Sequence, residues 1–464
     1  MPPGFYFPNP LFIEEKYTLS SSSEWDLLRN DPVYQECLAS MFRLHRFGIK
    51  LGLETISAML SALGDPQNQF HSIHIAGTNG KGSVAAMLAT VLRLAGYNVG
   101  RYTSPHLERF NERICINDQP IDDEAVVRSC QRAMAIEGLP RQPTFFEFTT
   151  AMALDEFARQ KVQWAVIETG MGGRLDATNV LHPVLSVITN ISLEHRAYLG
   201  ATIAEIAGEK AGIIKSNTPV VTGVRQQSAG NVIADQASKL GAPLYRHGRE
   251  FRCRRLPNMQ FDYYGIHHTY KKLHLGLSGD HQVDNASLVL AACELLEING
   301  HATIKEETLR KGLEDTRWPG RLELVGTAPE IILDGAHNLM SARILGRHLR
   351  RHLHNRNITL VIGILEDKPY RNILKDLIAS CSRVIVTQPK IDRAIPAEKL
   401  ELAAREFSPN VEVRTDVGEA VRYAVATTAK EDVICIAGSL YVVGEAKTAL
   451  AVMKNFENKP GITP

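Results

Sequence analysis

The chain has 464 residues, 44% of them hydrophobic and 22% charged, which is enough apolar material for two or three packed domains. Its formal net charge of +1 gives no electrostatic reason to expect nucleic acid or an anionic membrane as a partner. The seven cysteines form no C-x-x-C pair, no apolar run is long enough for a transmembrane helix, and the N-terminus lacks a signal pattern, so we expect a cytoplasmic protein with reduced thiols.

The N-terminal part predicts an extension followed by alternating helices and strands. Residues 1–34, with two proline-bracketed aromatic patches and a serine run, predict a weakly ordered extension. Two helices are expected within residues 35–63, with a turn near Phe47 and Gly48. The remaining expected elements are strands at 70–76, 164–168, 184–190 and 219–223, and helices at 83–95, 145–160 and 201–214. This alternation is typical of an α/β fold with a mostly parallel sheet.

The pattern changes twice in the second half. Residues 245–278 predict antiparallel strands or irregular structure, and a helix is expected at 285–298. After Trp318 the alternation restarts and predicts a complete doubly wound unit, with strands at 330–334, 358–363, 383–387, 411–415 and 432–436 separated by helices. We therefore expect a long N-terminal domain at 35–320 and a shorter domain at 321–464.

The stretch HIAGTNGKGS, residues 74–83, looks like a phosphate-binding loop with irregular spacing. Gly77 lies only three residues before Gly80, and Gly82 separates Lys81 from Ser83, so the usual G-x-x-x-x-G-K-[ST] pattern is not met. The expected context of strand, loop and helix is right, because backbone N–H groups at a helix start bind anions. The alternative is a tight turn with a solvated lysine.

Polar side chains follow neighbouring expected strands and fall at one sheet edge. Ser104, Glu168 and His195 each come after a strand, on the side where the phosphate loop lies. A capping serine, a solvated carboxylate and a satisfied histidine are the ordinary interpretations, and histidine is an unusual ligand for Mg²⁺. Lys210, within EIAGEKAGIIK, is from the residues alone best interpreted as an ordinary helical lysine.

Taken together the motifs resemble a known family. GTNGKGS, YTSPHLERFNERI, ETGMGGRLDATN, ITNISLEH, EIAGEKAGIIK, WPGRLE, LDGAHN and AGSLYVVGEA occur in this order. They resemble folylpolyglutamate synthase and dihydrofolate synthase of the Mur-ligase-like superfamily of ATP-dependent amide ligases, over about residues 35 to 455. The resemblance implies an N-terminal P-loop ATPase domain and a C-terminal Rossmann-like domain. It also identifies the loop with the extra glycine as the superfamily's own phosphate loop.

The resemblance further implies a reaction and residues for it. ATP would phosphorylate a substrate carboxylate, and the amine of L-glutamate would attack the acyl phosphate. The resemblance places ATP at Thr78, Asn79, Gly80, Lys81, Gly82, Ser83, Asn285, Arg321 and Asp334, with His337 as a further participant. Ser104 and Glu168 would hold one Mg²⁺, and His195 would hold a second together with Lys210, which is carbamylated in the family. This reverses the ordinary interpretation of Lys210.

The resemblance also covers the pterin side, and the chain departs from the family there and again directly after His195. Thr144, Leu175, Asp176 and Ala177 match positions that contact dihydropteroate in members with both activities, and residues 47–53 match a loop that covers the pterin. Some bifunctional members have an acidic residue where Lys50 stands, which puts dihydrofolate synthase activity in more doubt than glutamylation. Arg196 and Ala197 replace a more usual small polar and acidic pair.

The leading hypothesis is thus a ligase that adds glutamate to folates, and to dihydropteroate also. The alternatives are folylpolyglutamate synthase activity alone, a Mur-type ligase acting on a cell-wall nucleotide precursor, and a nucleotide-dependent switch without ligation. Residues 1–70 are too short for the additional domain of the cell-wall enzymes. Small-molecule substrates are the expected partners, and a monomer is expected because relatives are often monomeric.

Overall fold

The computed structural model describes residues 31–48, 50–257 and 259–457. An eight-stranded sheet organises the N-terminal part, in the order β4-β3-β2-β5-β1-β6-β7-β8. Its strands are β1 (His71–Ala76), β2 (Val99–Tyr102), β3 (Ile114–Ile116), β4 (Gln119–Pro120), β5 (Trp164–Glu168), β6 (Leu185–Ile188), β7 (Val220–Thr222) and β8 (Leu244–Arg246). Six neighbouring strands of this sheet, β2, β5, β1, β6, β7 and β8, are parallel. Strands β3 and β4 extend the edge beside β2 in antiparallel pairing.

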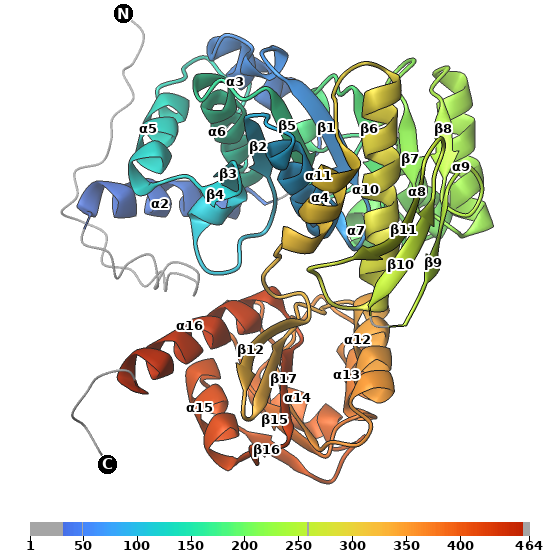
Figure 1. Ribbon diagram of the computed structural model, residues 1–464. Helices are drawn as coiled ribbons and strands as arrows, with labels where there is room; N and C mark the ends of the chain where they lie inside the picture. Colours follow the sequence, from blue (N-terminus) through green and yellow to red (C-terminus); the bar gives the residue numbers. More distant parts are fainter. Residues whose placement is uncertain (1–30, 49, 258, 458–464) are drawn as a thin grey trace, which may run out of the picture.

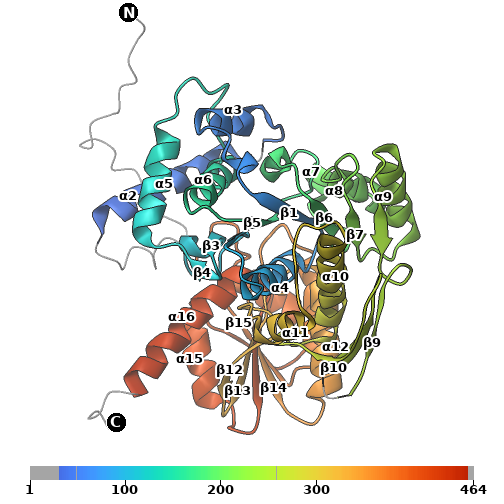
Figure 2. The ribbon, with the colours of Figure 1, turned by 45° about the horizontal axis from the view of Figure 1, so that its top comes forward.

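Helices cover both faces of this sheet because its strands are apolar on both sides. Trp164 and Val166 face one core and Ala165 and Ile167 face another, as the period of two in a strand requires. The first face carries α4 (Lys81–Leu94), α10 (Asp280–Ile298) and α11 (Glu306–Asp315) (Figure 2). The second carries α2 (Pro32–Arg43), α3 (Glu54–Ala62), α5 (Asp123–Met134), α6 (Phe145–Arg159), α8 (Ile203–Ala211) and α9 (Gln227–Lys239).

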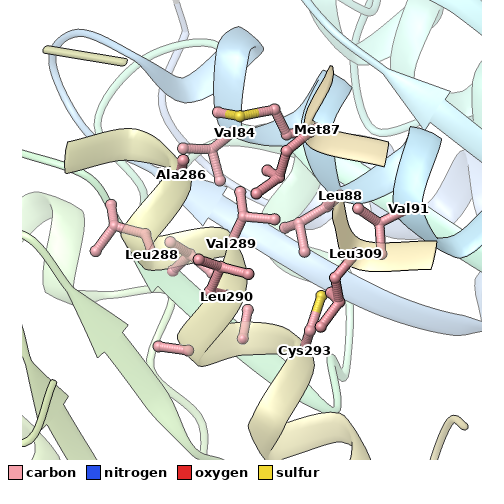
Figure 3. Packing of buried hydrophobic residues seen from close by; sticks show 14 of the residues in the cluster. Val84, Met87, Leu88, Val91, Ala286, Leu288, Val289, Leu290, Cys293 and Leu309 are labelled. Atoms are coloured by element: carbon pink, nitrogen blue, oxygen red, sulfur yellow. The ribbon is translucent and has the colours of Figure 1, made fainter. Parts of the chain in front are cut away.

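The helix that follows the phosphate loop is buried along its length. Val84, Leu88 and Val91 of α4 interdigitate with Val289 and Cys293 of α10, as Figure 3 shows. Helix α4 also packs against α11 and the sheet. Close packing on several sides fixes the start of α4, and therefore the loop before it, relative to the sheet.

The first helix begins earlier than expected. Residues 1–30 of the expected extension lie outside the described residues, but α2 starts at Pro32, inside that extension. Asp31 caps it by accepting a hydrogen bond from Val33 N at 2.9 Å, and proline suits the first helical turn. The buried Tyr34 donates its hydroxyl proton to Asn111 Oδ1 at 2.7 Å, which ties α2 to the domain.

The segment expected to be antiparallel or irregular forms a small antiparallel sheet. Its strands are β9 (Arg252–Arg255), β10 (Gln260–Tyr264) and β11 (Thr269–His274), in the order β11-β10-β9. Phe261, Tyr263 and Leu273 pack with α10 in the same core as α4. Helix α10 itself begins at Asp280, five residues before the expected start, so Asn285 lies inside the helix.

A six-stranded sheet, in the order β12-β13-β17-β14-β15-β16, forms the C-terminal part (Figure 1). Its strands are β12 (Glu323–Thr327), β13 (Glu330–Leu333), β14 (Ile358–Ile362), β15 (Arg383–Val386), β16 (Val411–Val413) and β17 (Val433–Ala437). Helices α12 (Leu339–His352), α13 (Tyr370–Ile378) and α14 (Ala397–Ala404) cover one face, and α15 (Val417–Thr427) and α16 (Leu440–Glu457) the other. The expected doubly wound alternation is present, with β12 as an additional antiparallel edge strand. Among the described residues, no helix is long and apolar enough to cross a membrane.

Candidate active site

The loop between β1 and α4 has a backbone that only glycine accommodates at two positions. Gly77 has φ 148° and Gly80 has φ 86°. A Cβ at residue 77 would lie 1.9 Å from Thr189 Oγ1, so no side chain fits there. The loop thus passes close to the end of β6, and α4 begins at Lys81, two residues earlier than the sequence predicts.

Residues that follow β6 hold the loop in place. Thr78 N donates to Asn190 O at 2.8 Å, and Asn79 N donates to Asn190 Oδ1 at 3.0 Å. Thr189 Oγ1 and Asn190 Nδ2 both donate to Asn79 O, each at 2.7 Å. These bonds preorganise the loop, so that little rearrangement is needed for an anion to bind at the start of α4.

The extra glycine of the loop faces a residue of the segment that joins the two sheets. A Cβ at Gly82 would come 2.7 Å from Cζ2 of Trp318. The Trp318 ring also contacts Arg101, whose guanidinium carbon lies 5.0 Å from the ring centroid. The irregular spacing of the motif therefore has a steric reason: the indole occupies the space that a side chain at residue 82 would need.

Lysine, carboxylate and serine meet beside the loop as the sequence predicts. Lys81 Nζ lies 3.7 Å from Glu168 Oε1, and Ser104 N donates to Glu168 Oε2 at 3.2 Å. Burial raises the pKa of the Glu168 carboxyl, and the Lys81 ammonium acts in the opposite direction. Ser83 is buried and accepts a hydrogen bond from Gln282 Nε2 at 3.3 Å. Burial outweighs the neighbouring positive charges of Lys81 and Arg321 at Glu168, and a bound cation would favour the ionised form of this carboxyl.

A buried ion pair lies under the loop. Lys210 Nζ donates to Gly77 O at 2.9 Å and to Glu194 Oε1 at 2.7 Å, and its side chain is 1% exposed. Burial raises the pKa of Glu194, but the ammonium groups of Lys210 and Lys81 outweigh burial and the pKa is lowered. His195 follows in a left-handed conformation with φ 44°, and burial lowers the pKa of its imidazole, which keeps the ring neutral as a metal ligand must be.

Residues of the second sheet face the loop across a cleft. Asn338, which caps α12, donates from Nδ2 to Asn79 Oδ1 at 2.8 Å, and Asn79 Nδ2 donates back to Asn338 Oδ1 at 3.3 Å. Asp334 is buried and accepts from Leu322 N at 2.9 Å and from Ala336 N at 3.0 Å. The cleft has a volume of about 1420 Å³ and is lined by Asn79, Gly80, His195, Asn285, Asn338 and Lys368, among others.

Arg321 and His337 stand at the joint between the two halves. Arg321 Nη1 donates to Gly320 O at 3.0 Å, and the residue lines a second, smaller cavity of about 350 Å³ together with Ser104 and Glu168. His337 Nδ1 lies 2.8 Å from Gly335 O, and burial lowers the pKa of this histidine to about 4. At neutral pH the His337 ring is therefore uncharged and can both donate and accept a hydrogen bond.

The predicted pterin residues form a separate group on α6 and the loop after β5. Thr144 caps α6 and donates from Oγ1 to Glu147 Oε2 at 2.8 Å. Asp176 is buried, and its Oδ2 accepts from Met171 N at 2.8 Å. Leu175 is half-buried and Ala177 buried beside it. A Cβ at Gly170 would come 2.6 Å from the Phe146 ring, so the two segments are in contact.

The segment expected to cover the pterin lies next to the start of α6. The His45 ring stacks on Phe145 at a centroid distance of 4.1 Å, and Phe42 lies 5.7 Å from the same ring. Lys50 is exposed, and Ile49 lies outside the described residues. The short 3-10 helix η1 (Leu44–Phe47) thus leads directly over the first turn of α6.

Three residues of this site were not predicted. Asn190 orders the loop, Glu194 pairs with Lys210, and Asn338 connects the loop to the second half. Each stands inside a motif that drew attention for another residue, because Glu194 precedes His195 in SLEH and Asn338 ends LDGAHN. A polar residue beside a candidate ligand is therefore the signal that could have identified them.

The chain matches two protein families, one for each sheet. The Mur ligase middle domain matches residues 75–293, and the Mur ligase glutamate ligase domain matches residues 320–440. Among curated relatives, the dihydrofolate synthase/folylpolyglutamate synthase of Bacillus subtilis is 38% identical over 429 residues, covering 90% of this chain and 99% of the relative.

Solved structures agree with this match. FolC of Escherichia coli in complex with DHPP and ADP has a TM-score of 0.83 at 30% identity, covering 92% of this chain and 99% of that one. The bifunctional folylpolyglutamate synthase/dihydrofolate synthase of Yersinia pestis complexed with AMPPNP and Mn ion has a TM-score of 0.81 at 30% identity, covering 91% and 98%. 

Because the Mur ligase middle domain and glutamate ligase domain occur in the order of the two sheets, the protein is an ATP-dependent ligase built from Mur ligase domains. The likeness to relatives extends over nine-tenths of its length and nearly the whole of theirs. The chain belongs to the dihydrofolate synthase/folylpolyglutamate synthase family.

Proposed function

We propose that the protein joins L-glutamate to the free carboxyl group of reduced folates, and of 7,8-dihydropteroate also, with hydrolysis of ATP to ADP and phosphate. The observation that carries the proposal is the preorganised phosphate loop with Lys81 and Glu168 beside it, open to a cleft whose opposite wall belongs to the second sheet. The ligands named for the Escherichia coli and Yersinia pestis structures support it.

The chemistry explains why this site needs mainly positioning and charge. A carboxylate resists attack by an amine, so its oxygen first attacks the γ-phosphorus of ATP, giving an acyl phosphate and ADP. The glutamate amine then attacks the acyl carbon, and phosphate leaves with the former carboxylate oxygen as the amide forms. Lys81 would neutralise charge on the transferred group, and the loop N–H groups from Gly80 to Ser83 would bind the phosphates, because those of Thr78 and Asn79 donate to Asn190.

The oxygen atoms of Ser104 and Glu168 fit Mg²⁺, which prefers hard oxygen ligands. Glu168 is buried with Lys81 as a distant counter-charge at 3.7 Å, so a bound cation would satisfy it. Held by these two residues, an ion would supply positive charge to the phosphates of ATP. His195 would hold a second ion, and its neutral ring is compatible with that role.

A carbamate on Lys210 would complete the second ion site. The reaction joins the neutral amine to CO₂ and releases one proton, leaving a terminal carboxylate as ligand. Burial lowers the pKa of Lys210, which favours the neutral amine that reacts, while Glu194 opposes it. The amine lies under the loop, within 2.9 Å of Gly77 O, so its modification would put negative charge at the place where a metal near the phosphates is needed.

The second half of the molecule would complete the nucleotide site on closure. Arg321, Asp334 and His337 are the residues we propose to contact ATP from this side, and Asn285 of α10 would contact it from the first half. Arg321 lies at the proposed boundary between domains 35–320 and 321–464. The family matches support this boundary, because the middle-domain match ends at residue 293 and the glutamate-ligase-domain match begins at residue 320. Such a hinge position allows closure to bring the guanidinium to the phosphates.

The pterin would bind where η1 meets the start of α6, near Thr144, Leu175, Asp176 and Ala177. Lys50 is exposed and stands where some bifunctional relatives have an acidic residue. The use of dihydropteroate is therefore the part of the proposal that needs a test of its own. Folylpolyglutamate synthesis alone is the alternative for this pocket. The cytoplasmic location and the monomeric state remain predictions.

The experiment uses purified protein, Mg–ATP and labelled L-glutamate with either 7,8-dihydropteroate or a reduced folate monoglutamate. We expect label in the product of both reactions. Label in the folate reaction alone would reduce the proposal to folylpolyglutamate synthase activity and direct attention to Lys50. Label in neither, with a uridine-linked peptide precursor accepted instead, would refute the proposal in favour of a cell-wall ligase.

A further inference from the structure

Three side chains of different chemistry lie together beside the large cleft, on elements other than the phosphate loop, and two of them, His247 and Asp284, line that cleft. His247 follows β8, Cys253 lies on β9, and Asp284 lies in the second turn of α10. Among the residues that the structure describes, their ligand atoms all lie within 4.8 Å of one another. Cys253 Sγ is 3.5 Å from His247 Nε2 and 3.8 Å from Asp284 Oδ1. All three residues are half-buried, so the cluster is reachable from solvent.

The separations match those between ligands of one tetrahedral ion. Bond lengths of about 2.3 Å to sulfur and about 2.0–2.1 Å to imidazole nitrogen at a tetrahedral angle place the two ligand atoms roughly 3.5 Å apart. The sulfur and nitrogen of Cys253 and His247 have this separation already. A thiol and an imidazole favour zinc-like ions over Mg²⁺, so the nucleotide's own metal would not compete for them.

Two arginines oppose a cation here and set the conditions for binding. Arg225 Nη2 lies 3.3 Å from His247 Nδ1 and donates to Asp284 Oδ1 at 3.0 Å, and Arg255 Nη2 lies 2.8 Å from the same oxygen. The Asp284 oxygen that Cys253 Sγ approaches is thus the one that both arginines hold, so an ion that uses it must displace them. A ring that binds an ion through Nε2 carries its proton on Nδ1, so Arg225 must release that nitrogen. Its side chain is 59% exposed and can move away.

We propose that His247, Cys253 and Asp284 form a binding site for a thiophilic divalent ion of the zinc class, with a fourth position open to the cleft. The ion would connect the end of the large sheet and the small sheet to α10. Asp284 immediately precedes Asn285, and both line the cleft. Occupancy would therefore fix the part of α10 that faces the nucleotide. The open position allows a water molecule or an external ligand to bind, which distinguishes this arrangement from a closed structural site.

The test is a titration of the full-length protein with Co²⁺, in the absence of nucleotide, followed by the thiolate-to-cobalt charge-transfer absorption. We expect one equivalent to produce this band and Zn²⁺ to displace it. Cys253→Ser should abolish the band, and His247→Gln should weaken Co²⁺ binding at least about tenfold, the usual effect of losing one ligand contact. Arg225→Gln should strengthen binding, because it removes the competing donor.

A matched control is Cys381→Ser, because Cys381 is also a half-buried free thiol but lies on the other sheet's side of the molecule. This variant should titrate like the parent. Absence of the band in the parent, or a band that survives Cys253→Ser, would overturn the proposal. If Cys253→Ser fails to fold by circular dichroism, the opposite responses of His247→Gln and Arg225→Gln decide, and equal affinity in these two variants and the parent would also overturn it.

Discussion

The pairing of Lys210 with Glu194 allows a quantitative test of the resting state of the site. The two side chains are 1% and 13% exposed and their atoms lie 2.7 Å apart, so little water screens them. Removing one partner of a buried ion pair typically costs about 3–5 kcal/mol, because the other charge stays buried and unpaired. Lys210→Met also removes the hydrogen bond that Gly77 O accepts from the same amine. We expect it to destabilise the protein by about this amount.

A double-mutant cycle isolates the interaction between the two residues. Lys210→Met, Glu194→Gln and the double variant are compared by urea unfolding, followed by circular dichroism and by tryptophan fluorescence, since the buried Trp164 reports on the same sheet. The double variant should lose less stability than the sum of the single variants, with a coupling of about 1–3 kcal/mol. Coincidence of the two probes is required before a free energy is assigned.

The sign of the coupling separates the free ammonium from a carbamate. A carbamate is negative, so Glu194 would repel it and the coupling would vanish or reverse. The cycle is therefore measured in CO₂-depleted buffer and again with bicarbonate and Mg²⁺. A coupling near zero in CO₂-depleted buffer would refute the ion pair as described. A favourable coupling that bicarbonate does not change would count against the carbamate.

Three further predictions concern the loop and its strand. Lys81→Ala should lower kcat by orders of magnitude with the fold intact by circular dichroism, because the lysine lies at the phosphate loop and is not part of the apolar core; full activity would contradict the loop assignment. Gly82→Ala should cost about 1–3 kcal/mol of overpacking against Trp318 and raise the KM for ATP, whereas Gly208→Ala, where a Cβ meets open space, should leave the KM unchanged. Burial lowers the pKa of His74 to about 3, so between pH 6.5 and 3 only the unfolded chain binds this proton. Stability should therefore fall with decreasing pH by up to about 1.4 kcal/mol per unit from this group, and His74→Gln should flatten the urea-midpoint profile; an unchanged profile would contradict the assignment.

Local patterns in the sequence predicted the elements that carry the site. The alternation of β1 and the glycines of the loop are properties of neighbouring residues, and Glu168 was placed correctly at the end of β5 because parallel strands end at one edge. The start of α10 differs because Asp280 in its first turn is compatible with a helix N-terminus, although the apolar period begins later. The edge strand β12 depends on pairing with β13, which its own residues do not indicate.

Contacts between residues that are distant in the chain could not be predicted from the sequence. Trp318 and Gly82 are far apart in the chain, and nothing in either motif indicates that they touch. Asn79 and Asn338 are separated by 259 positions, and their pairing depends on how the two sheets are placed. The phosphate loop and the polar side chains at its sheet edge were predicted from the residues, whereas the carbamate on Lys210, the ATP contacts of the second half and the pterin positions came from resemblance; these roles stay predictions.

The amide pair between Asn79 and Asn338 is uncharged, and this has a consequence for how substrates enter. A neutral hydrogen bond contributes about 0.5–1.5 kcal/mol, so the pair contributes about 2 kcal/mol, a factor of roughly thirty in population. Ionic strength does not weaken it, unlike the Arg351–Asp280 ion pair, at 2.9 Å, that also joins the two halves. The contact beside the phosphate loop therefore keeps its strength when the salt concentration changes, whereas the ion pairs farther along the same boundary weaken, so added salt loosens the two halves at their rim before it loosens them at the nucleotide site.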